Sequence, residues 1–441
     1  MRTTKRQILL ATAFISLAVP KIAAAAGGES SANAGLVLFA LALLLLAAKA
    51  GGYLAERLGQ PAVLGELLVG VGCANLLPLF FEAKGVAFVR SDPTLDVSAE
   101  IGVLILLFDV GLETDLRSLI RVGWSALFAA LLGIAAPMLL GWAAAAWLLP
   151  DSPTLAHVFV GATLSATSIG ITSRVLKDLG VMQSREGQII LGAALIDDVL
   201  GLVVLAVVTG AVTAATAGTA SLSALAIGGI LVRAILFLGI TVGLGQLLSE
   251  HLIRLAARAG KPDILLVIGL SLCFILAYVA ELIGLAGIIG AFAAGLMLDP
   301  YGQGVRAREE EAALAELMHP LSALFVPLFF ILIGIQVDVM SLVSPEILAL
   351  GAVLIVCALA GKLVCGLGVL GGGVSRLAVG IGMIPRGEVG LIFAGIGLGM
   401  ILEGKPLLTQ GIFSAVVLMA LVTTLVAPIG LRWAFSSAQT E

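Results

Sequence analysis

Residues 164–174 read LSATSIGITSR, and residues 382–392 read GMIPRGEVGLI. Each stretch lies inside a long apolar segment that is interrupted by glycine, serine, threonine or proline, and the two segments occupy corresponding places in the two halves of the chain. In secondary transporters such a pair marks discontinuous helices from inverted repeats, which cross near the middle of the bilayer where the substrate binds. The two stretches therefore predict an all-α membrane protein with two crossed, broken helices.

The composition also indicates a membrane protein. Hydrophobic residues make up 60% of the 441 residues and charged residues only 12%, whereas about 25% of a soluble domain is charged. The apolar runs are continuous rather than alternating, which favours spanning helices over a barrel. We expect about thirteen membrane segments, at 35–56, 61–80, 96–115, 121–149, 155–176, 187–214, 222–248, 263–284, 286–299, 318–338, 345–370, 377–401 and 408–432.

The first 26 residues resemble a secretory signal peptide. A basic start is followed by an apolar stretch and small residues, so cleavage is expected near Ala24 to Ala26. An uncleaved extra helix is the alternative, although Pro20 and Lys21 would interrupt it. Residues 27–441 are then a single transmembrane transport unit, with no soluble regulatory domain expected after the last helix.

The basic residues of the loops predict the orientation, because cytoplasmic loops carry an excess of Lys and Arg. With the mature N-terminus outside, the outer loops receive only Lys84, Arg90 and Lys405. An odd number of helices then places the C-terminus in the cytoplasm. The cytoplasmic side receives Arg57, Arg117, Arg121, Arg174, Lys177, Arg185, Arg254, Arg258, Lys261, Arg306, Arg308, Arg376 and Arg432.

Residues 194–202, ALIDDVLGL, place Asp197 and Asp198 in an otherwise apolar run. A charge at the bilayer centre costs at least ~2.5–3.5 kcal/mol, so such groups face a bundle interior or an aqueous cavity and serve a function. Adjacent helical residues project roughly 100° apart, so the two carboxylates cannot both point along one line, and one can engage a partner helix while the other faces a cavity. We expect Lys362, near the middle of segment 345–370, to pair with Asp197, which leaves Asp198 free to bind a small cation.

The broken segment 155–176 supplies oxygen ligands for such a cation. Sodium is a hard cation that prefers oxygen, by analogy with calcium and magnesium, and Thr167, Ser168 and Thr172 offer hydroxyls beside freed backbone carbonyls. A proton and a sodium ion would compete for Asp198, and alternating exposure of the site would convert that competition into exchange.

The pair of Asp197 and Lys362 bears on the stoichiometry. If Lys362 releases its proton when Asp197 is recruited to the cation, two protons move per cation and transport is electrogenic. The alternative is an ion pair that only locks two helices together.

Arg386 and Glu388 lie on the second broken segment. Residues two apart on a helix do not face each other, so we expect them to pair with other elements. They could act in transport, or they could neutralise the ends of the broken helix, which carry partial charge. Lesser candidates, weighted toward structural roles or left open, are Lys49, Glu66, Asp109, Arg233 and Glu281.

Seven motifs follow one another along the chain: QPAVLGELLVG (60–70), LFDVGLETDL (107–116), ATSIGITSRVLKDLG (166–180), ILGAALIDDVLGLVVLAVV (190–208), IIGAFAAGLML (288–298), GKLVCG (361–366) and MIPRGEVGLIFAGIGL (383–398). In their order and spacing these motifs resemble the monovalent cation:proton antiporter-2 family of bacterial sodium/proton antiporters. The resemblance implies the sodium/proton antiporter fold, with interleaved core and dimerisation domains that move like an elevator, in a homodimer in the bacterial inner membrane with a periplasmic N-terminus.

The same resemblance assigns roles to residues. It implies that Asp198 is the main cation and proton carrier, that Asp197 pairs with Lys362, and that Thr167 and Ser168 lie beside the site. Members with both aspartates and the lysine are usually electrogenic, so exchange of Na⁺ or Li⁺ for H⁺ is expected to be electrogenic. Potassium/proton exchange and electroneutral exchange remain alternatives. The potassium reading is weakened because potassium-efflux members often carry a nucleotide-binding domain after the last helix.

Other classes of function fit less well. An intramembrane aspartyl protease needs two carboxyls that share a proton across a gap, and adjacent aspartates on one helix diverge. Channels use rings of carbonyls or charges around an axis, whereas this single chain carries two broken helices. We find no glycine-rich nucleotide loop, metal cluster or nucleic-acid surface. The expected partners are therefore Na⁺ or Li⁺, protons and membrane lipid, with no cofactor.

Overall fold

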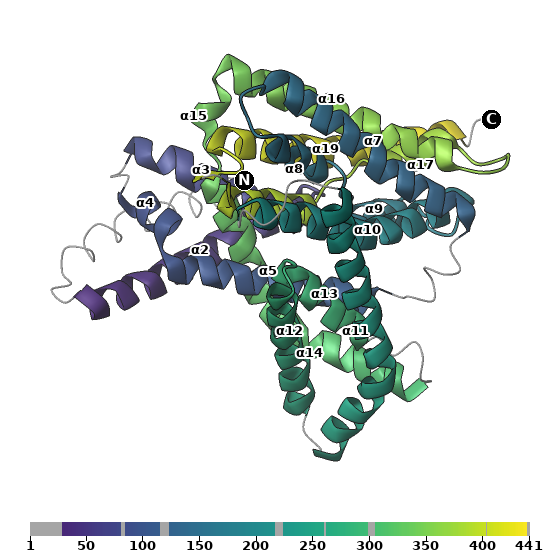
Figure 1. Ribbon diagram of the computed structural model, residues 1–441, viewed down its shortest axis with the longest axis horizontal. Coiled ribbons are helices and arrows are strands. Elements are labelled where there is room, and N and C mark those ends of the chain that lie inside the picture. The colour runs from purple at the N-terminus through teal and green to yellow at the C-terminus, as the bar shows by residue number, and fades with distance from the viewer. Residues whose placement is uncertain are drawn as a thin grey trace. The chain divides into compact units, whose positions relative to one another are not determined.

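The computed structural model describes residues 29–80, 84–114, 123–216, 224–259, 262–298, 305–402 and 404–438, and these residues are almost entirely helical (Figure 1). The expected signal peptide, residues 1–26, lies outside them. The elements are α2 (Glu29–Arg57), α3 (Ala62–Phe80), α4 (Lys84–Ser91), α5 (Pro93–Glu113), α7 (Trp124–Leu148), α8 (Thr154–Thr163), α9 (Ile169–Asp178), α10 (Arg185–Thr216), α11 (Ala224–Ala259), α12 (Pro262–Leu282), α13 (Gly287–Met297), α14 (Val305–Gln336), α15 (Val339–Leu342), α16 (Pro345–Leu363), the 3₁₀ helix η1 (Val364–Gly368), α17 (Arg376–Gly382), α18 (Glu388–Gly399), β1 (Ile401–Leu402), β2 (Lys405–Pro406) and α19 (Gln410–Ala438).

The chain divides into two compact units, the first of which comprises Met1–Val103 and Ser322–Met340. Here α2 and α3 form a hairpin so close that a Cβ on Gly51 or Gly65 would collide with the backbone of the other helix. Their apolar faces pack with the end of α14 around Leu44, Leu95 and Ile331. Small residues at the contact are how helices approach closely where lipid gives no hydrophobic driving force.

The second unit comprises Leu104–Leu321 and Ser341–Glu441. Within it α7 packs against α8, α10 and α16, and α16 packs against α19 (Figure 1). A second group consists of α11, α12 and α13, which contact one another. The buried core of the first group includes Ala129, Leu176, Ile190, Met383 and Leu431.

Both predicted helix breaks are present, which confirms this feature of the expected fold. Residues 164–168 separate α8 from α9, and residues 383–387 separate α17 from α18. Proline disfavours helical backbone in the residue before it, so Pro385 accounts for the second break. In the first break, the Ser165 hydroxyl donates a hydrogen bond to the Ala162 carbonyl at 2.7 Å. Such local side-chain bonds compete with the backbone hydrogen bonds of a helix.

Eight of the described helices are long and apolar enough to cross a bilayer, and four shorter apolar helices accompany them. The total of about thirteen crossings therefore stays a prediction. Two helices extend beyond the predicted apolar segments: α14 begins at Val305, ahead of the segment expected at 318–338, and α11 continues to Ala259, past the segment expected at 222–248. The added stretches are rich in Ala, Glu, Leu and Arg, which are strong helix formers whether or not they lie in lipid.

Candidate functional site

The two helix breaks lie against each other and bond across the crossing. The Ser168 amide donates to the Pro385 carbonyl at 2.8 Å, and the Thr172 hydroxyl donates to the Gly382 carbonyl at 2.9 Å. A Cβ on Gly387 would lie 2.6 Å from the Ser168 hydroxyl oxygen, so the contact requires glycine there. Interrupted helices need such partners, because backbone polar groups at membrane depth must be satisfied within the protein.

The two aspartates lie in the middle of the unbroken helix α10, which contacts the helices α8, α9 and α17 that flank the breaks. Asp197 accepts from Lys362 of α16, whose Nζ lies 3.1 Å from Oδ2 and 3.2 Å from Oδ1. Both side chains are 0% exposed. The pairing that the sequence predicts is therefore present in the geometry, and its part in transport remains a prediction.

Two residues that sequence reasoning missed enclose this ion pair. A Cβ on Gly133 of α7 would lie 2.8 Å from Cys365 Sγ, 3.5 Å from Lys362 Nζ and 3.8 Å from Asp197 Oδ1. Cys365 is fully buried. Because Gly133 has no side chain, the α7 backbone can pack closely against the ion pair. The chain contains 54 glycines, and nothing in the sequence distinguishes Gly133 from the others.

Asp198 differs from its neighbour in having an oxygen without a partner. The residue is 7% exposed, and its Oδ1 is buried without a hydrogen-bond partner among the described residues. Buried polar atoms are nearly always hydrogen-bonded, so an orphan oxygen calls for an explanation. An ionised carboxylate only accepts, so a cation or a proton would satisfy this atom.

The predicted hydroxyl ligands face the second broken helix. Thr167 donates to the Met383 carbonyl at 3.4 Å, and Ser168 donates to Glu388 Oε2 at 3.2 Å. Both residues are about 1% exposed. A hydroxyl that donates still has lone pairs for a cation, so the role of Thr167 and Ser168 as ligands remains a prediction.

Arg386 and Glu388 bond to other elements, in agreement with their spacing. Arg386 is 1% exposed, and its guanidinium donates to the Ala166 carbonyl at 2.9 Å and to the Ala358 carbonyl at 3.3 Å. The Thr424 hydroxyl donates to the Arg386 carbonyl. Glu388 is the first residue of α18, where a negative charge is favoured by the helix dipole. Each of the two charges thus bonds to a residue of the first break, and its role in transport or in structure remains a prediction.

The lesser candidates differ from these site residues in their burial or in the unit to which they belong. Lys49, Arg233 and Glu281 are exposed on their helices, and Asp109 is half-buried. Glu66 is 4% exposed and belongs to the first unit. Within the described parts of the chain, no three His, Cys, Asp or Glu side chains are grouped as metal ligands.

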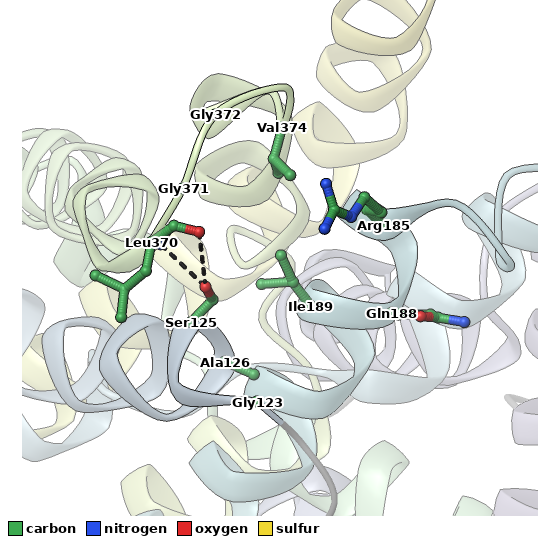
Figure 2. Close-up of a pocket in the computed structure, with 10 residues that line it drawn as sticks. All are labelled: Gly123, Ser125, Ala126, Arg185, Gln188, Ile189, Leu370, Gly371, Gly372 and Val374. Carbon is green, nitrogen blue, oxygen red and sulfur yellow. Dashed lines mark hydrogen bonds between the residues drawn. The ribbon is translucent and has the colours of Figure 1, made fainter.

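A cavity of about 650 Å³ opens elsewhere in the second unit. Figure 2 shows it between the starts of α7 and α10 and the loop after η1, with Arg185 directed toward Val374 and the Ser125 hydroxyl bonded to the Leu370 backbone. None of the predicted site residues lines this cavity. The candidate site is thus the enclosed region around Asp198, rather than this open cavity.

Comparison with known proteins supports the resemblance. Residues 39–436 match the family described as "Sodium/hydrogen exchanger, transmembrane". The chain is 37% identical to the high-affinity Na(+)/H(+) antiporter NhaS3 of Synechocystis over 441 aligned positions, covering 92% of this chain and 91% of that protein. It is 32% identical to the Na(+)/H(+)-K(+) antiporter GerN of Bacillus cereus over 404 positions, covering 90% and 96%.

A solved structure shares the fold. The sodium proton antiporter MjNhaP1 from Methanocaldococcus jannaschii at pH 8 superposes with a TM-score of 0.70, covering 91% of this chain and 97% of that one. The sequence identity of 17% limits this likeness to the fold itself.

Proposed function

Since the chain belongs to the sodium/hydrogen exchanger family, we propose that it is a secondary antiporter that exchanges Na⁺ for H⁺ at Asp198. One observation carries the proposal: a buried carboxylate oxygen without a partner among the described residues, in the middle of α10. Next to it, the neighbouring carboxylate is already neutralised by Lys362. The names of the relatives NhaS3 and GerN, both Na⁺/H⁺ antiporters, point to the same pair of ions.

The reaction needs a single site. A cation or a proton occupies Asp198 but not both, because either one satisfies the same buried charge. When the site faces one side of the membrane, Na⁺ displaces the proton, and when it faces the other side the proton displaces Na⁺. Alternating exposure then couples the two fluxes. The ion pair argues against the alternative of an intramembrane aspartyl protease. Such a protease needs two carboxyls that share a proton, whereas Asp197 is paired with Lys362.

Arg386 and Glu388 have a supporting part in this proposal. They connect the two helix breaks to each other and, through Ala358, to the helix that carries Lys362. The cation ligands beside Asp198 are then Thr167, Ser168 and freed carbonyls of the first break, with Asp197 recruited when Lys362 lets it go. Release of the Lys362 proton at that step makes the exchange electrogenic.

The setting of the protein is also part of the proposal. We place it in the bacterial inner membrane as a homodimer, with core and dimerisation domains, a cleaved signal peptide, a periplasmic N-terminus and a cytoplasmic C-terminus. Support comes from the charge bias of the loops and the form of the first 26 residues. Li⁺ is expected to replace Na⁺, since it is also a hard cation.

Potassium exchange is a second candidate, favoured by one observation: the name of the relative GerN includes K⁺ as well as Na⁺. Both candidates are tested with purified protein in liposomes. A proton gradient is imposed, then Na⁺, Li⁺ or K⁺ is added, and the internal pH is followed with and without a clamp on the membrane potential. We expect Na⁺ and Li⁺ to dissipate the gradient at a rate that depends on the potential. A response to K⁺ alone, or none to the potential, would favour the alternatives.

A further inference from the structure

Gly201 lies beside the two aspartates, one turn further along α10. It follows Asp197 by four residues and Asp198 by three, and residues at these spacings are neighbours on one helix face. Its direction lies about 40° from that of Asp197 and about 60° from that of Asp198, on the arc between them. A side chain there would tilt toward the N-terminal turn, which carries both carboxylates.

The space at this position is open although the residue is buried. Gly201 is among the buried residues of α10, yet a Cβ there would meet no heavy atom within 4 Å among the described residues, apart from its two chain neighbours and the backbone of its own helix. Other glycines of the same helix are different: a Cβ on Gly210 would lie 2.9 Å from Ile230, and one on Gly187 would collide with the Val181 carbonyl. Those two glycines allow close packing, whereas Gly201 keeps a space free.

The open space and the orphan oxygen belong to adjacent turns of one helix. Protein interiors are close-packed, with few voids as large as a water molecule, so an open space one helical turn from a buried, unpartnered carboxylate oxygen is informative. Polar surroundings that are roomy enough hold water or an ion rather than stay dry. We propose that the space beside Gly201 accommodates the transported cation with its remaining oxygen ligands, and that Gly201 sets the largest cation accepted. This inference rests on the proposed function of Asp198.

The substitution Gly201→Ala tests the inference, because it adds a single methyl group to the space without colliding with the protein. K⁺ is larger than Na⁺, and Na⁺ is larger than Li⁺. The methyl group should therefore penalise K⁺ most and Li⁺ least. One methyl-sized change in a binding pocket typically alters discrimination on the order of tenfold or more, so we expect the ratio of apparent affinities for Li⁺ over K⁺, or for Li⁺ over Na⁺ where K⁺ is inactive, to rise roughly tenfold.

The measurement is cation/proton exchange in liposomes with Li⁺, Na⁺ and K⁺ in turn, for the wild type and the variant. Gly243→Ala is the matched control, because Gly243 is an exposed glycine of α11 with open space around its Cβ position. The control has the same gain in helix propensity and should leave the ion ratios unchanged. The rise in unfolding temperature caused by each cation in detergent gives a second ranking that does not need transport.

The outcomes separate the inference from the proposed function. A shift toward the smaller cations in Gly201→Ala, absent in Gly243→Ala, supports the role of Gly201. Unchanged ion ratios, or an equal loss for all three ions in a folded variant, would overturn it. If the wild type itself exchanges none of the three ions for protons, the proposed function fails and the inference falls with it.

Discussion

Removing one charge of the Asp197–Lys362 pair should cost far more than removing both. The two side chains are 0% exposed and 3.1 Å apart, so the discount that applies to exposed ion pairs does not apply here. Breaking a buried pair by removing one partner typically costs about 3–5 kcal/mol, because it leaves an uncompensated charge in the interior. Asp197→Asn and Lys362→Met should each destabilise the protein by about that amount.

The double variant Asp197→Asn/Lys362→Met should be much more stable than the sum of the single effects predicts. Replacing a whole buried pair with neutral groups of similar size is often neutral or stabilising. With single costs of about 3 kcal/mol or more and a double cost of about 1 kcal/mol, the two sites would be coupled by about 5 kcal/mol, far beyond the additivity error of independent sites.

The assay is unfolding of the purified protein by SDS in detergent micelles, followed by tryptophan fluorescence, for the wild type and the three variants. Glu281→Gln is a useful control, because Glu281 is an exposed charge on an apolar helix and its removal should change stability little. If the two single costs simply add in the double variant, or if the single variants are as stable as the wild type, the pair does not stabilise the site as we argue.

Three further predictions follow from the packing around the site. Gly133→Ala should destabilise the protein by about 1–3 kcal/mol through overpacking. Adding Cys365→Ala to that variant should restore most of the lost stability, because the Cys365 sulfur is the atom nearest to the new methyl group. The same SDS titration measures both variants, and a double variant no more stable than Gly133→Ala would contradict the contact. Arg386→Lys should lower the folded yield and the unfolding midpoint, since one ammonium cannot replace a guanidinium that donates to two carbonyls. Each of these hydrogen bonds is worth about 1.5–3 kcal/mol. An unchanged midpoint would argue against a stabilising role of the two bonds. Gly387→Ala should impair folding by pressing on Ser168, whereas Ser168→Ala should cost only about 1 kcal/mol, and equal effects in a thermal-unfolding assay would contradict that order.

The broken helices could be predicted from sequence because their causes are local. Pro385 and the hydroxyl-rich run at 164–168 disfavour continuous helix wherever they stand. The pairing of Asp197 with Lys362 was also predictable, since a buried lysine and a buried carboxylate each need a partner. Few charged residues lie inside the apolar segments, so few partners were available for Asp197.

The packing around the site was not predictable, because it depends on which helix faces which. Gly133 and Gly201 have no side-chain polar group, and the thiol of Cys365 is only a weak one, so none of the three stands out in an apolar segment. Gly133 allows a close approach and Gly201 leaves a space, yet both read as small residues in apolar helices. The charged start of α14 was not predictable for a different reason. Hydropathy locates only the apolar part of a helix, whereas α14 (Val305–Gln336) begins with charged residues that also favour helix.

Counting the protons released when Na⁺ binds tests most directly whether the two ions compete for Asp198. Calorimetric titration of the detergent-solubilised protein with NaCl, in two buffers of different ionisation enthalpy, gives the number of protons released per cation bound. The wild type should release at least one proton per Na⁺ bound, and Asp198→Asn should show no Na⁺-dependent release. Sodium binding with undiminished proton release by folded Asp198→Asn would show that the two ions compete somewhere other than at Asp198.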